Sequence, residues 1–303
     1  MEQKLRLLQR RYEPRVHVHS YRGGARVERK ETHKPAQICP DVPWETWIRE
    51  HTDTAVSYLD MASAHFHDVK ARSYRALGVK RGAVVLDVGC GVGQDAYELK
   101  RLVGARGRVV GIDYSEEIIA EARRRAKDAS SFPKFVVCEA HHIGFSSDTF
   151  DASRADRVLQ HLEDPLAAFE EMVRVTKPGG TVQIVDRDWG LVAVESNDQA
   201  VTRKILDLVC GKIRNGWIGR RVPVLFRECG LQEVRVEAIP ITMQDFRVAD
   251  RLLDLTLAAG HAADEGIVSP DEKTAWLLEL QERSDAGRFF AAWVMFIVTG
   301  KKG

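Results

Sequence analysis

Three glycines stand at alternate positions directly after a short apolar run that carries an acid. The run spans residues 83–88 and includes Asp87, and it is followed by Gly89, Gly91 and Gly93. Glycine permits positive φ and lets ligand atoms approach the main chain closely. A helix that begins next would point its unbonded N–H groups and the positive end of its dipole at the same place. The stretch therefore predicts a cofactor-binding loop.

Two classes of cofactor are compatible with this loop. Residues 91–96, GVGQDA, match the G-x-G-x-x-A fingerprint of dinucleotide-binding proteins. A strand-end acid and Asp95 at the helix start would instead repel a pyrophosphate and suit a cationic ligand. The sulfonium and ammonium groups of S-adenosylmethionine are such cations. Asp113, which ends the next apolar run, can accept hydrogen bonds from both ribose hydroxyls in either class, so it leaves the choice open.

His161, in the stretch VLQHLEDP (158–165), is the best candidate for a general base. It follows an apolar run that should be a strand, and a histidine titrates near neutral pH. The residues leave two roles open for it, a catalytic base or a wall of the pocket. His65 and His67 have no partner at the spacing of a metal site, so no metal is predicted.

Apolar, β-branched runs alternate with segments of helical period through the middle of the chain. Five such alternations predict parallel strands joined by right-handed crossovers, and ligands of such sheets bind beyond the carboxyl ends of the strands. Two later runs add strands, so we expect an α/β fold with a doubly wound, mostly parallel, seven-stranded sheet. The predicted strands are residues 83–88, 108–113, 134–140, 149–158, 181–186, 232–241 and 289–300.

Segments of helical period also flank this core. Ser115 and Asp164 are predicted N-caps of two crossover helices, and KPGG at 177–180 predicts a turn. The remaining helical segments are predicted at residues 45–77, 196–214, 221–229 and 246–284, the last of them broken near 260–270.

Composition limits the classes of function. The 303 residues carry a net charge of +1 and 44% hydrophobic residues, which is typical of a soluble globular protein. No apolar run is long enough for a membrane span, the N-terminus lacks a signal-peptide core, and five cysteines form no CxxC pair. These features predict a cytoplasmic protein with reduced thiols and no membrane partner. A homo-oligomer is compatible with them.

A series of motifs, in order, resembles the class I S-adenosylmethionine-dependent methyltransferases of the small-molecule group. The resemblance covers about residues 80–186 and also fits the closing strand. It is carried by VLDVGCGVG (85–93), GIDYS (111–115), CEAHHIGFSSDTFD (138–151), VLQHLEDP (158–165) and VTKPGGTVQIVD (175–186). It implies a Rossmann-like methyltransferase fold and S-adenosylmethionine as the cofactor.

The resemblance also implies roles for single residues. Asp87, Gly89, Cys90 and Gly91 would surround the methionine part of the cofactor, and Asp113 would hold the ribose. The remaining implied contacts are Tyr114 packing on the adenine, Glu139, Ala140 and His141 along the adenine edge, and Arg157 near the carboxylate of the cofactor. His141 stands where the family usually has an acid, which puts that contact in question.

A change from basic to globular composition near Pro43 divides the chain into a basic N-terminal extension (1–43) and a domain (44–303) that the resemblance makes a methyltransferase domain. Within the domain we expect N-terminal helices (44–80), a cofactor-binding core (81–186), substrate and lid segments (187–230 and 243–288) and a final strand (289–303). A lid would exclude water from the reaction, and Trp189 and Trp217 could line an apolar pocket.

The predicted acceptor is a small, partly apolar metabolite methylated on O, N or C. Residues 1–34 hold ten Lys or Arg against four Glu, so a nucleic-acid methyltransferase with a basic arm is an alternative. The stretch RADRVLQHL lacks the Pro-Pro-aromatic motif of many enzymes that methylate base amines, which disfavours nucleic acid. A nicotinamide-dependent oxidoreductase is a further alternative, but it leaves the later motifs without a role.

Overall fold

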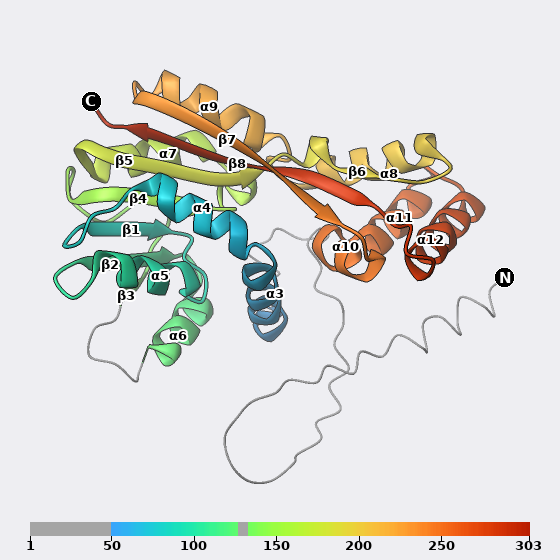
Figure 1. Ribbon diagram of the computed structural model, residues 1–303, viewed down its shortest axis with the longest axis horizontal. Helices are drawn as coiled ribbons and strands as arrows, with labels where there is room; N and C mark the ends of the chain where they lie inside the picture. Colours follow the sequence, from blue (N-terminus) through green and yellow to red (C-terminus); the bar gives the residue numbers. More distant parts are fainter. Residues whose placement is uncertain (1–49, 127–132) are drawn as a thin grey trace, which may run out of the picture.

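The computed structural model describes residues 50–126 and 133–303, which form one α/β sheet with helices on both faces (Figure 1). The strand order is β3-β2-β1-β4-β5-β8-β6, and β7 pairs with the other side of β8. Strands β1 to β5 are parallel, whereas β6, β7 and β8 join antiparallel. The strands are β1 (Val84–Val88), β2 (Arg108–Asp113), β3 (Lys134–Val137), β4 (Phe150–Asp156), β5 (Thr176–Arg187), β6 (Ala193–Val194), β7 (Gln232–Met243) and β8 (Ala291–Lys301).

The doubly wound, mostly parallel sheet confirms the predicted fold class. The sheet has eight strands in place of the predicted seven, because Ala193 and Val194 form a short strand on β8 beyond the end of β5. The strand order reverses between β1 and β4, so the carboxyl ends of these two strands mark the place where ligands of such sheets bind.

Alternate residues of each strand face two separate hydrophobic cores. On β1, Val85 packs with α4 (His67–Leu77), α5 (Gln94–Val103) and α6 (Glu116–Arg125). Leu86 points to the opposite face, where α7 (Pro165–Val175) and α9 (Ile218–Glu228) supply the core. This alternation follows from the two-residue period of a strand, and it accounts for the near-continuous apolar runs in the sequence.

Local signals start the crossover helices where the sequence predicts. The Ser115 hydroxyl accepts from the Ile118 amide at the start of α6, and the Asp164 carboxylate accepts from the Ala167 amide ahead of Pro165 in α7. The predicted turn at 177–180 loops out of β5, because Phe150 pairs with Thr176 and Ala152 pairs with Thr181.

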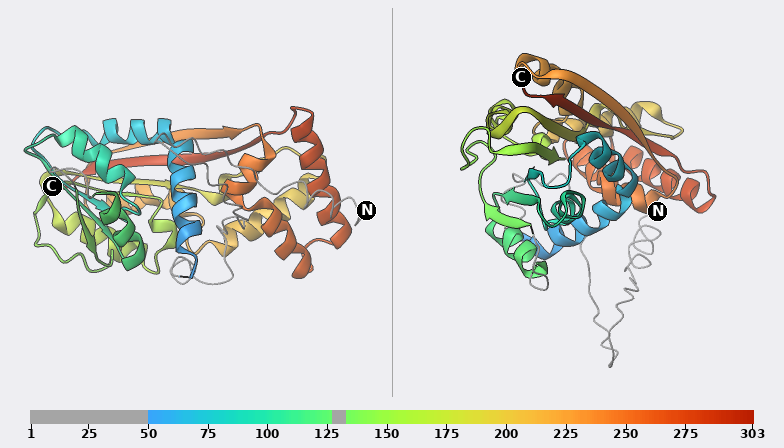
Figure 2. Two further views of the ribbon diagram at one scale, coloured as in Figure 1. Left: turned by 90° about the horizontal axis from the view of Figure 1, so that it is seen from below. Right: turned by 60° about the vertical axis from the view of Figure 1, so that its left-hand side comes forward.

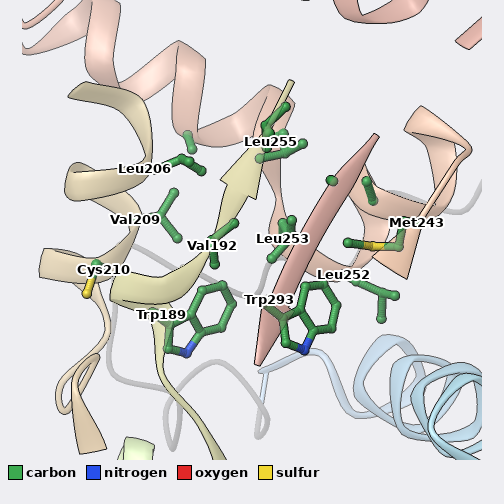
Figure 3. Close-up of a cluster of buried hydrophobic side chains, with 14 of the residues drawn as sticks. Trp189, Val192, Leu206, Val209, Cys210, Met243, Leu252, Leu253, Leu255 and Trp293 are labelled. Atoms are coloured by element: carbon green, nitrogen blue, oxygen red, sulfur yellow. The ribbon is translucent and has the colours of Figure 1, made fainter. Parts of the chain in front are cut away.

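The helical cap comprises α8 (Gln199–Lys212), α10 (Phe246–Leu253), α11 (Leu255–Asp264), α12 (Pro270–Asp285) and β6. It lies beyond the carboxyl ends of the parallel strands, along the extended half of β7 and β8 (Figure 1). A third core fills it with side chains such as Leu206, Leu253 and Trp293 (Figure 3). Most of the predicted lid segments therefore form one packed unit next to the expected ligand site, whereas α9, which lies in the predicted segment 187–230, packs on the sheet.

The predicted helix at 45–77 is two helices within the described residues, α3 (Thr52–His65) and α4, which meet at Phe66. In Figures 1 and 2, α3 lies between the cofactor-binding half of the sheet and the helical cap. Its residues Ala55 and Leu59 pack on Val92 in the glycine loop and on Ile118 in α6. In the part of the chain that is described, no helix is both long and apolar enough to cross a membrane. The basic extension lies outside these residues.

Candidate cofactor and acceptor site

The glycine loop at the end of β1 has a shape that side chains would prevent. Gly89 has a φ of 63°, and a Cβ there would lie 2.4 Å from Cγ2 of Val158. Gly93 has a φ of 88°, and a Cβ there would lie 2.4 Å from Cζ of Phe135. Both positions are left-handed, a region that favours glycine. The loop therefore has, at the carboxyl edge of the sheet, a main-chain shape that glycine allows at these two positions and a side chain would not.

Asp113 fixes this loop to the end of β2. Its Oδ2 accepts from the Gly91 amide at 3.0 Å, and its Oδ1 accepts from the Ser115 amide at 3.2 Å. Burial raises the pKa of Asp113 to about 6, although these hydrogen bonds oppose the rise. At neutral pH the side chain is therefore an ionised acceptor beside the glycine loop.

A buried ion network lies beneath the loop, centred on a residue that was not predicted from the sequence. Arg154, on β4, is fully buried; its Nη1 lies 3.3 Å from Asp87 and 2.8 Å from Asp95, and its Nη2 lies 3.0 Å from Asp156. The sequence did contain a signal for this residue, because a charged arginine is unusual within an apolar run that should be a buried strand. Lys70, on α4, also pairs with Asp95 at 2.5 Å.

The two acids of the loop have different electrostatic environments. Burial raises the pKa of Asp87 to about 7 against the attraction of Arg154, and its Oδ2 has no hydrogen-bond partner within the described residues. Burial also acts on Asp95, but Lys70 and Arg154 hold the pKa of Asp95 well below its usual range. Asp95 is therefore ion-paired to Lys70 and Arg154 inside the protein, and the second of these cations is shared with Asp87 and Asp156.

Arg157 follows β4 in a left-handed conformation, with a φ of 57°. Its amide donates to the Val185 carbonyl at 2.7 Å, its Nε pairs with Asp156 at 2.9 Å, and its guanidinium lies 4.9 Å from the centre of the Phe66 ring. A non-glycine residue at positive φ stores strain, so these contacts must hold the side chain at the strand end.

The residues predicted along the adenine gather at the ends of β2 and β3. The Cys138 amide donates to the Asp113 carbonyl, which joins the two strand ends. Tyr114 packs against the cluster formed by α3 and the glycine loop. Ala140 is buried, Glu139 is exposed, and Nε2 of His141 is buried with no partner in the described part of the chain.

His161 ends a short 3-10 helix (Leu159–His161) after β4, and its Nε2 lies 3.0 Å from Nε2 of Gln160. The orientation of the Gln160 amide is set by Trp189, whose indole N–H can only donate and lies 2.8 Å from Oε1. The Gln160 nitrogen therefore donates, and Nε2 of His161 accepts. Burial, followed by the charges of Arg187, Arg157 and Arg214, lowers the pKa of His161 to about 3.

The end of β5 begins the segment that the sequence predicts for the acceptor. Trp189, in a 3-10 helix (Trp189–Leu191) after β5, is buried beside Trp293 of β8 (Figure 3). Trp217 is 51% exposed and packs near Gly190, so it lies at the surface. Arg187 lies between the two buried tryptophans and is itself buried. Arg187 and Trp189 both belong to the segment 187–230 that the sequence predicts for the substrate, but no role for Arg187 itself was predicted.

Comparisons with known proteins agree with this geometry. Residues 79–207 match the family model described as a methyltransferase domain. An uncharacterised 37.1 kDa protein of transposon TN4556 in Streptomyces fradiae is 32% identical over 284 residues, which are 92% of this chain and 79% of that protein. A demethylmenaquinone methyltransferase of Staphylococcus aureus is 31% identical over 144 residues. The match covers 48% of this chain and 59% of that enzyme, so it spans little more than half of the relative's length.

Solved structures share the fold at lower identity. Phosphoethanolamine N-methyltransferase 2 of Haemonchus contortus, solved in complex with S-adenosyl-L-methionine, superposes with a TM-score of 0.55 at 19% identity. The superposition covers 86% of this chain and 60% of that one. One assignment follows from the glycine loop, from the acids at the ends of β1 and β2, and from these relatives. The chain belongs to the class I S-adenosylmethionine-dependent methyltransferases, with S-adenosylmethionine as its cofactor.

Proposed function

We propose that the enzyme transfers a methyl group to O, N or C of a small, partly apolar metabolite that binds between the sheet, α3 and the helical cap. The observation that carries this proposal is the position of the apolar cap. It lies beyond the carboxyl ends of β4 and β5, next to the glycine loop that receives the cofactor. Such an arrangement encloses a small acceptor and keeps water from the reaction.

The residues at the strand ends fit S-adenosylmethionine. Asp87 has a buried carboxylate oxygen without a partner among the described residues, which suits the ammonium of the methionine part. Gly89 and Gly91 hold the main chain of the loop at positive φ, a shape in which the main chain around Cys90 can lie against the methionine part of the cofactor. The ionised Asp113 has the acceptors that two ribose hydroxyls require.

The adenine contacts are part of the same proposal. Tyr114 would pack on the base, with Glu139, Ala140 and His141 along its edge. His141 can form a hydrogen bond through the buried Nε2 that has no partner in the described structure. Arg157, fixed by Asp156, would face the carboxylate side of the cofactor.

The bound cofactor supplies an activated methyl carbon, and the protein has to hold the acceptor atom in line with it. Well-oriented intramolecular reactions reach effective molarities of about 10⁵ M or more, so positioning alone supplies most of the acceleration. We propose that His161 shapes the acceptor side as a neutral hydrogen-bond acceptor. Its Nε2 is occupied by Gln160, and burial together with the surrounding arginines lowers its pKa.

Two measurements test the function. Titration calorimetry with S-adenosylhomocysteine and, separately, with NADH should show binding of the first and none of the second. A mass-spectrometric screen of metabolite extracts with isotopically labelled S-adenosylmethionine should find a small molecule that gains one labelled methyl group. Labelling of RNA or of protein instead of a metabolite would overturn the proposed acceptor class.

A further inference from the structure

Arg187 is a buried cation that has no carboxylate partner among the described residues. It ends β5 and is 2% exposed, and no acid in residues 50–126 and 133–303 lies within ion-pair distance of its guanidinium. Its Nε and Nη2 have neutral partners at 3.4 Å, the Gln160 side-chain oxygen and the Tyr58 hydroxyl. Its Nη1 is buried and has no hydrogen-bond partner in the same part of the chain. A buried charge is costly unless it is paired.

The neighbouring acids are already engaged elsewhere. Asp156 pairs with Arg154 and Arg157. Asp186 precedes Arg187 on the strand, so its side chain points to the other face of the sheet. The Asp186 carboxylate accepts from the amides of Arg187 and Gln160 instead. Arg187 therefore forms no ion pair with a described carboxylate, although its charge opposes the rise that burial causes in the pKa of Asp186.

The surroundings of the guanidinium are aromatic. Its carbon lies 4.1 Å from the ring centre of Trp189 and 5.6 Å from that of Trp293. Figure 3 shows the two indoles side by side at the edge of the apolar core of the helical cap. These rings hold the planar fork of the arginine in one orientation, as recognition of a planar anion requires.

The position of Arg187 assigns it to the acceptor rather than to the cofactor. It ends β5, two strands from β1, and neighbouring strands lie about 4.8 Å apart, so it stands about 10 Å to the side of β1. Since Val88 is in register with Ile184 through Ala155, Arg187 also lies beyond the end of β1 along the strand direction. The cofactor-binding acids Asp87 and Asp113 are on β1 and β2, on the other side of β4. His161 follows β4, the strand between these two regions, and the charge of Arg187 helps to lower the pKa of His161.

We propose that Arg187 binds a carboxylate of the methyl acceptor, which makes the acceptor a monoanionic carboxylic acid with an apolar body. The inference rests on the proposed function and narrows its substrate class. One buried cation without an ion-pair partner among the described residues suits a monoanion, and the unpartnered Nη1 supplies a free donor for it. The carboxylate would reach it between α3, which carries Tyr58, and the tryptophans of the cap.

The test uses the full-length protein saturated with S-adenosylhomocysteine, and its probes are benzoate and octanoate with their uncharged amides. Calorimetry should show that each carboxylate binds more tightly than its amide. Arg187→Met should weaken carboxylate binding by about tenfold or more, the loss of a hydrogen bond to a charged group. Arg187→Lys should give an intermediate loss, because lysine keeps the charge without the fork. Exposed Arg221→Met is the matched control and should change nothing.

The outcomes separate this inference from the proposed function. If wild-type protein fails to bind S-adenosylhomocysteine, the proposed function itself is wrong. If it binds S-adenosylhomocysteine and discriminates no carboxylate from its amide, only the role of Arg187 is wrong. A loss of S-adenosylhomocysteine affinity in Arg187→Met would assign the arginine to the carboxylate of the cofactor and overturn the inference.

A thermal measurement without any acceptor gives a second answer. Since Arg187 is buried without a counter-ion among the described residues, Arg187→Met should raise the melting temperature of the free protein. Arg220→Met should lower it, because it leaves the fully buried Asp188 without its partner. A fall in melting temperature for Arg187→Met would show that the arginine is a structural residue and would overturn the inference.

Discussion

The amide nitrogen of Gln160 lies 3.0 Å from Nε2 of His161 and donates a hydrogen bond to it. The donor direction follows from Trp189, whose indole N–H takes the oxygen of the same amide. The histidine that the sequence indicates as a base is therefore held as an acceptor within the protein. This relationship decides how the histidine should respond to mutation and to pH.

We expect His161→Asn to retain most of the turnover, because asparagine can also accept a hydrogen bond from Gln160. A general base typically contributes about 10²–10⁴-fold, so a loss of less than tenfold in kcat points to a positioning role. The measurement is kcat and KM against pH from about 5.5 to 9, using the metabolite that the methylation screen identifies. A fall of about 10² or more in kcat with loss of an inflection near neutral pH would restore the base role.

The stability of the protein should also depend on His161. The pKa of His161 in the folded protein is lowered to about 3. Below pH 6.5 this histidine is therefore protonated in the unfolded chain but stays neutral in the folded chain until the pH nears 3. Its contribution is full above pH 6.5 and is lost as the pH falls toward 3, by at most about 1.4 kcal/mol per pH unit. Urea unfolding from about pH 7.5 to 4.5 should show a smaller decline for His161→Asn than for the wild type. Equal slopes would contradict the buried, neutral histidine.

Cofactor affinity should fall in acid through Asp113. Burial raises the pKa of this carboxyl to about 6, so it is ionised above that pH and progressively protonated below it. Protonation removes an acceptor from the ribose site, and affinity for S-adenosylhomocysteine should decline below about pH 6. Asp113→Asn should bind about tenfold or more weakly at pH 8. It should also lose the part of the pH dependence that belongs to Asp113.

The control for Asp113 is the neighbouring Ser115, which caps α6 and has no expected contact with the cofactor. Ser115→Ala should lower stability by about 1 kcal/mol and leave affinity unchanged. Wild-type affinity that stays constant from about pH 8 to 5 would rule out the ribose role of Asp113.

The fold and much of the cofactor site follow from local patterns in the sequence. Apolar runs predict the strands, and Ser115 and Asp164 predict helix starts, since each signal lies within a few residues. Arg154 was missed, and Arg187 was placed only within the expected substrate segment 187–230 without a role of its own, because the partners of both residues are distant in the chain. Arg154 lies 67 residues from Asp87, and Arg187 lies 129 residues from the Tyr58 that it contacts. Such pairings exist only once the elements are packed.

Removal of Arg154 should be the most destabilising single change in the core. Arg154→Met would leave the carboxylates of Asp87, Asp95 and Asp156 buried with too little positive charge. Breaking a buried ion pair in this way costs about 3–5 kcal/mol. The free energy of unfolding in urea gives the value. Arg101→Met, which removes an exposed pair with Glu98, should change it by less than about 0.5 kcal/mol.

The glycine loop provides the sharpest steric test. Gly89→Ala would place a Cβ 2.4 Å from Cγ2 of Val158 at a φ of 63°, so both a clash and backbone strain result. Together these should destabilise the protein by about 2–4 kcal/mol and weaken cofactor binding. Val158→Ala in the same chain should recover the part due to the clash and leave the part due to φ. Gly144→Ala, with open space and no positive φ, is the matched control and should be neutral. The measurement is urea unfolding of the three single variants and the double variant. The recovery would appear as non-additive changes in the free energy of unfolding for Gly89→Ala and Val158→Ala. Strictly additive changes would contradict the close approach of Val158 to Gly89.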